Sequence, residues 1–100
     1  MNVPAELIGK WDQAYRTYAA MDSAGVPVAG HAGQAMDFAR ASWDVADAWR
    51  RIVDSSPLLP WWVRAAAHAS VQVFMEQARH WEKISHEWAA TSDSPDAGGR

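Results

Sequence analysis

The segment QAMDFARASWDVADAWRRIVD, residues 34–54, decides the fold, because its apolar residues recur at intervals of three and four positions. At about 100° per residue, the apolar and small side chains fall on one face of a helix and the charged ones on the other. The apolar face holds Ala35, Phe38, Ser42, Val45, Ala46, Trp49, Ile52 and Val53. The charged face, interpreted as a solvated surface, holds Asp37, Arg40, Asp44, Asp47, Arg51 and Asp54. The segment therefore predicts an amphipathic helix that covers an apolar core.

Two more helical segments flank this one. Residues 4–22 begin with a proline, which suits a first helical turn, and continue with apolar residues at helical spacing. Residues 60–90 form the longest periodic segment, and Gly- and Pro-containing breaks at 23–33 and 55–60 separate the three. The sequence predicts an all-α fold, a small three-helix bundle over residues 1–90 with the third helix longest. The polar segment 91–100 is predicted to be a flexible, disordered tail.

Composition excludes several classes of protein. The net charge of −3 disfavours nucleic-acid binding, which depends on clustered Lys and Arg. The apolar runs are shorter than the roughly 20 residues that cross a bilayer, so no membrane association is expected. No export signal is recognisable and there is no cysteine, which favours a cytoplasmic location. Twenty alanines, and seven arginines against two lysines, are typical of a GC-rich bacterial, phage or plasmid gene.

The third segment carries two apolar stripes. The first is expected to pack on the other helices and holds Val63, Ala67, Ser70, Phe74, Ala78, Trp81, Ser85 and Trp88. The second lies about 100° around the helix and holds Trp62, Ala66, Ala69, Val73, Gln77, His80 and Ile84. A helix that touches two neighbours needs a wide apolar face, which explains part of this pattern. The third helix is nevertheless longer than its neighbours, so part of it has nothing in its own chain to pack on.

The second stripe and the segment PLLPWW, residues 57–62, predict an interface with a protein partner. Trp is frequent among the residues that dominate binding energy, and prolines make this turn rigid. The predicted interface residues are Leu58, Leu59, Trp61, Trp62, Ala66, Ala69, Val73, His80 and Ile84, with Trp43 and Met36 on the flank of the second helix. The alternative is that the side chains of residues 58–62 fold back and cap the open end of the bundle. Both interpretations remain open from the sequence.

The functional hypothesis is a non-enzymatic protein–protein interaction module. It self-associates as a helical homodimer, or it acts as a small adaptor or inhibitor that docks on a larger protein through the third helix. The alternative hypothesis is an apolar or aromatic small molecule bound between helices, in a pocket walled by Trp11, Tyr15, Trp49 and Trp81.

No catalytic residues, metal site or cofactor are predicted. The chain lacks cysteine, a Gly-x-Ser-x-Gly motif and a phosphate-binding glycine loop that follows a strand. The pairs Glu76/His80 and Glu82/His86 have a spacing that occurs in helical metal sites, but they fall on different sides of the third helix. The second helix offers only outward-facing aspartates to complete such a site.

Overall fold

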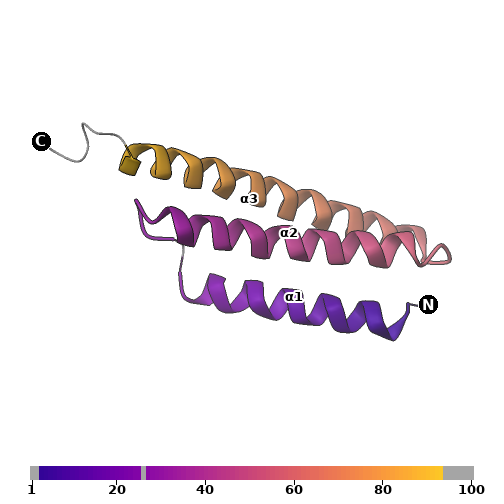
Figure 1. Ribbon diagram of the computed structural model, residues 1–100. Coiled ribbons are helices and arrows are strands. Elements are labelled where there is room, and N and C mark those ends of the chain that lie inside the picture. The colour runs from indigo at the N-terminus through magenta and orange to yellow at the C-terminus, as the bar shows by residue number, and fades with distance from the viewer. Residues whose placement is uncertain (1–2, 26, 94–100) are drawn as a thin grey trace, which may run out of the picture.

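The protein is a bundle of three helices. The computed structural model describes residues 3–25 and 27–93 (Figure 1). Helix α1 spans Ala5–Ser23, α2 spans Ala32–Asp54 and α3 spans Trp61–Asp93, and the described residues contain no strand. The predicted all-α bundle is therefore confirmed, with α3 the longest helix at 33 residues. Helix α3 continues through Asp93, three residues beyond the helix end predicted from sequence, and residues 94–100 of the predicted tail lie outside the described part of the chain.

Proline and glycine set the helix boundaries. Pro4 precedes α1, and its carbonyl accepts hydrogen bonds from the amides of Leu7 and Ile8 at 3.0 and 3.2 Å. Gly25 follows the end of α1 with φ of 99°, a left-handed conformation that side-chain-bearing residues rarely adopt. The carbonyl of Pro60 accepts from the Arg64 amide at 3.0 Å, and α3 begins at the next residue. The two breaks predicted from sequence are thus the two chain reversals.

The central helix is α2, which runs antiparallel to α1 on one side and to α3 on the other (Figure 1). Within the described residues, no Cα atom of α1 lies within 8 Å of a Cα atom of α3. No residue of α1 is fully buried, whereas α2 has buried residues along most of its length. The bundle is therefore open on one side, between α1 and α3.

The apolar face predicted for α2 is the core. Seven of its eight residues are buried and Trp49 is half-buried, while all six residues of the charged face are exposed. Ala41 and Ala48 are also buried, at 4% and 7% exposure, and widen this face beyond the prediction. In α3 the first stripe is buried or half-buried throughout, and buried Val71 extends it by about 20° of helix circumference.

Aromatic side chains bridge the gap between the backbones of α1 and α3. The Tyr18 ring of α1 meets Phe38 of α2 at 5.5 Å and Phe74 of α3 at 5.0 Å between ring centroids, both edge-on. Phe38 in turn contacts Trp81 of α3 at 5.6 Å. The Gln77 amide nitrogen donates to the Tyr18 hydroxyl at 3.0 Å. Edge-on aromatic pairs contribute about 0.5–1.5 kcal/mol beyond their buried area, so Tyr18 is the main tie between α1 and α3.

Replacing Tyr18 with phenylalanine is expected to lower the free energy of unfolding by about 1 kcal/mol, because the ring contacts stay and the hydrogen bond to Gln77 is lost. Urea unfolding followed by circular dichroism measures this change. Tyr15→Phe, which removes a hydroxyl from a more exposed ring of the same helix, is the matched control and should unfold like the parent protein. Equal midpoints for all three proteins would show that the Tyr18–Gln77 contact does not stabilise the bundle.

Candidate interaction surface

An uncharged stripe of α3 faces solvent. We call Trp62, Ala66, Ala69, Val73, Gln77, His80 and Ile84 the α3 stripe. Trp62 and Val73 are 61% and 58% exposed. Ala66, Ala69 and His80 are also exposed, while Gln77 and Ile84 are half-buried. None of the seven is Asp, Glu, Lys or Arg, although these residues make up 21% of the chain. The chain's own helices thus leave most of this second stripe uncovered.

The turn between α2 and α3 divides its apolar residues between the interior and the surface. Leu59 is only 7% exposed and closes the end of the bundle, so it is not available as a surface anchor and does not belong to the predicted interface. Its neighbour Leu58 is 84% exposed and Trp61 is 80% exposed. The Arg64 guanidinium donates to the carbonyls of Ser56 and Pro57 at 3.3 and 2.9 Å, and these bonds hold the turn against the first residues of α3.

Trp43 and Met36, predicted to flank the interface, lie elsewhere. The Trp43 indole nitrogen donates to the Glu82 carboxylate at 2.9 Å, and the Arg79 guanidinium lies 5.9 Å from the centre of the Trp43 ring. Glu82 is nine residues from Val73, which places it about 180° around α3 from the stripe. Met36 precedes Trp43 by seven residues and shares its side of α2. The structure therefore does not join these two residues to the α3 stripe.

The four residues of the predicted ligand pocket do not form one enclosure. The rings of Trp11 and Tyr15 stack at 5.2 Å between centroids, and Trp49 meets Trp11 edge-on at 5.2 Å. Trp81 contacts Phe38 and Trp88 and reaches the other three only through further rings. Trp11, Tyr15 and Trp49 fill the space between them with their own contacts, so they form part of the packing.

Three hollows of the surface lie away from those rings. One of about 240 Å³ sits beside the α1–α2 connection and is lined by Met21, Ala24, Gly25, Pro27, Val28, Gln34, Asp37 and Phe38. A second of about 160 Å³ lies in the turn at residues 55–59. The third, of about 360 Å³, is a polar groove between α1 and α2 that includes Lys10, Asp44, Asp47 and Arg51. None of the three is lined by a residue of the predicted ligand pocket.

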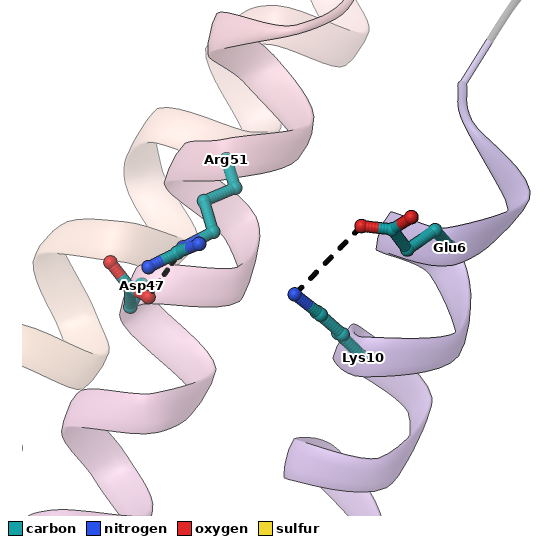
Figure 2. A network of polar contacts seen from close by, with 4 residues as sticks. All are labelled: Glu6, Lys10, Asp47 and Arg51. Carbon is teal, nitrogen blue, oxygen red and sulfur yellow. Dashed lines mark hydrogen bonds and ion pairs between the residues drawn. The ribbon is translucent and has the colours of Figure 1, made fainter.

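The polar groove carries ion pairs within each helix. Figure 2 shows Glu6 with Lys10 on α1, at 3.9 Å, and Asp47 with Arg51 on α2, at 2.8 Å. All four side chains are more than half exposed, and exposed pairs of this kind contribute about 0–1 kcal/mol. The groove is lined by two basic side chains, Lys10 and Arg51, and two acidic ones, Asp44 and Asp47, so it has no net charge that would select a charged ligand. This face is a solvated surface, as the sequence pattern predicts.

Within residues 3–25 and 27–93, no group of three or more His, Asp or Glu side chains is placed to hold a metal ion. No helix of that part of the chain is both long enough and apolar enough to span a bilayer. Comparison of the chain with protein-family models, with curated proteins and with solved structures found no match.

Proposed function

We propose that the chain is a protein-association module that binds a second copy of itself through the α3 stripe and the exposed part of the turn. The observation that supports this most directly is the exposure of Trp61 and Trp62 side by side, at 80% and 61%. At about 200 Å² per Trp side chain, these two indoles leave roughly 280 Å² of aromatic surface in water. Leu58 adjoins them and is 84% exposed.

A patch of this size favours a protein partner. The largest contiguous apolar patch on a typical monomeric protein is about 300–600 Å² and is often a functional surface, and the two indoles with Leu58 reach that range. The stripe continues the patch along α3 with Val73, which is 58% exposed. Twofold homodimers are the commonest assemblies, and a stripe on one long helix offers the same surface to both copies. The cysteine-free sequence supports a cytoplasmic setting for this association.

The proposal is tested by sedimentation equilibrium across the micromolar range, on the parent protein and on Val73→Lys. The parent protein should be a dimer at the upper concentrations. Val73→Lys should weaken dimerisation at least tenfold, because burying the lysine ammonium at the interface removes its hydration. The flexible lysine side chain can extend toward the edge of the interface, which keeps the loss of affinity from being larger.

Gln72→Lys is the matched control. It adds the same charge at the next position of α3, on an exposed residue outside the stripe, and should dimerise like the parent protein. Helical circular dichroism should be equal for all three chains. A parent protein that stays monomeric at high micromolar concentration would contradict the proposal, and so would equal weakening by both lysines.

A further inference from the structure

The α3 stripe has the same spacing read in either direction. Its positions 62, 66, 69, 73, 77, 80 and 84 are separated by four, three, four, four, three and four residues, with Val73 at the centre. Any stripe can face its own copy in a parallel pair, but a stripe whose spacing is the same in both directions can also match a second copy position by position when the two helices run antiparallel. Residue 62 then faces 84, residue 66 faces 80, residue 69 faces 77, and Val73 faces Val73.

We propose that two copies associate through α3 in this antiparallel register, with the two Val73 side chains meeting on the twofold axis. This inference rests on the self-association proposed above and specifies its geometry. It concerns α3 and the turn of each copy. Gln77, at the edge of the stripe toward α1, also donates to the Tyr18 hydroxyl of its own chain.

Side-chain size is complementary in this register. Ala66 faces His80 of the second copy and Ala69 faces Gln77, so a small side chain opposes a long one at both levels. Trp62 faces Ile84, which is half-buried in its own chain and offers a lower apolar surface to the indole. A parallel pair would oppose Trp62 with Trp62 and alanine with alanine, which gives a steric conflict at one level and gaps at two others. Packing density at specific interfaces approaches that of protein interiors, so the antiparallel pair is favoured.

The stripe is also straight enough for a long contact. Trp62 and Val73 are 11 residues apart, and so are Val73 and Ile84. Eleven residues make three turns of about 3.67 residues each, so these side chains shift around the helix by only about 20° per 11 residues. Since α3 is continuous from Trp61 to Asp93, the whole stripe is presented by one helix. The contact extends over about 33 Å of helix, at roughly 1.5 Å per residue.

The register also accounts for the two ends of α3. The Ser85 hydroxyl donates at 2.8 Å to the carbonyl of Ala32, the first residue of α2, and α3 continues beyond this contact to Asp93. Position 58 of one copy is level with position 88 of the other in the antiparallel pair. The turn of each copy, with its exposed Leu58, thus approaches the last part of α3 of its partner, where Trp88 is half-buried.

Charges along the edge of the stripe do not oppose the pairing. Glu76 is level with Ser70 of the second copy, and Lys83 is level with Val63. In this register the Glu76 carboxylate does not face another carboxylate, and the Lys83 ammonium does not face another ammonium. Like-charge repulsion, which would favour another register, is therefore absent at these positions. A helix about 10–12 Å wide laid along this stripe covers roughly 350 Å² of each copy. With the turn contacts at both ends, the total approaches the lower bound of about 1,000 Å² for a specific interface.

Disulfide cross-linking tests the register, because the parent protein has no cysteine and any introduced thiol is the only one. Val73→Cys should form a disulfide-linked dimer in high yield under mild oxidation. Ala66→Cys should not link to itself, since residue 66 and its copy lie about 21 Å apart along the axis, beyond the roughly 7 Å between Cα atoms that a disulfide spans. A mixture of Ala66→Cys and His80→Cys should link to each other. His68→Cys, on the far side of α3, is the control for random collision.

The outcomes separate the register from self-association itself. Efficient linking of Ala66→Cys to itself indicates a parallel pair and overturns the register. A protein that sediments as a dimer, yet links no better at position 73 than at position 68, also overturns the register while self-association stands. A parent protein that sediments as a monomer removes both. Each thiol variant is compared with the parent by sedimentation under reducing conditions, so a failure to dimerise is distinguished from a failure to link.

Discussion

Phe38→Ala is expected to lower the free energy of unfolding by about 3–5 kcal/mol, the range for removing a buried aromatic side chain. Phe38 is 3% exposed and lies where all three helices meet, in contact with Tyr18 of α1 and Trp81 of α3. The total stability of a small domain is about 5–15 kcal/mol, so this one change removes a large part of it. Since 1 kcal/mol shifts Tm by about 4–8 °C in a domain of this size, Tm should fall by at least about 12 °C.

Thermal and urea unfolding measured by circular dichroism give both quantities for Phe38→Ala. The matched control is Ile8→Ala, which also truncates an apolar helical side chain to a methyl group, at a position that is 49% exposed. Its cost should stay at about 1 kcal/mol, because roughly half of that side chain remains in water after folding. If the two variants unfold at the same midpoint, the aromatic junction does not carry the stability assigned to it.

The helices and their faces could be predicted because the spacing of apolar residues along a helix follows from which side chains are buried. A charged residue stays in water and a large apolar one leaves it, so α2 could be assigned face by face from residues such as Phe38 and Arg40. Ala41 and Ala48 were missed because alanine has so little apolar surface that either environment suits it. Their burial widens the apolar face of α2, which packs against both α1 and α3, while the backbones of α1 and α3 stay apart. The width of this face was thus hard to predict, because it depends on residues whose own preference is weak.

The candidate surface was less predictable where the backbone is not periodic. Leu58 and Leu59 are adjacent and chemically identical, yet one is 84% exposed and the other 7%. Inside a helix the period decides which of two neighbours is buried, but in the turn the direction of each side chain depends on the local backbone and on the hydrogen bonds from Arg64. Trp43 shows a related difficulty. Its position beside the charged face of α2 follows from the helical period of that segment. Its partners Glu82 and Arg79 belong to α3, so the contact depends on how the two helices pack, which the period of one helix does not give.

Trp62→Ala is expected to weaken self-association about 1,000-fold. The indole is 61% exposed, so its removal should leave the fold and its unfolding midpoint nearly unchanged. Each dimer would lose two indoles, one at either end of the α3 pair. At about 2 kcal/mol for each anchoring Trp, the loss is about 4 kcal/mol, which is three orders of magnitude in Kd. Sedimentation equilibrium at high protein concentration measures it.

Trp61→Ala provides the control that distinguishes a specific contact from general stickiness. Trp61 is the more exposed of the two, at 80%, but it points about 100° away from Trp62 around α3. It therefore belongs to the apolar patch of the turn but lies at the rim of the α3 contact, where side chains contribute less binding energy than at the centre. If exposure alone drove association, Trp61→Ala would be the more damaging change. The α3 pairing predicts the opposite order, with Trp61→Ala weakening the dimer less than tenfold. Equal effects from the two variants would mean that copies meet through the turn, with no defined contact along α3.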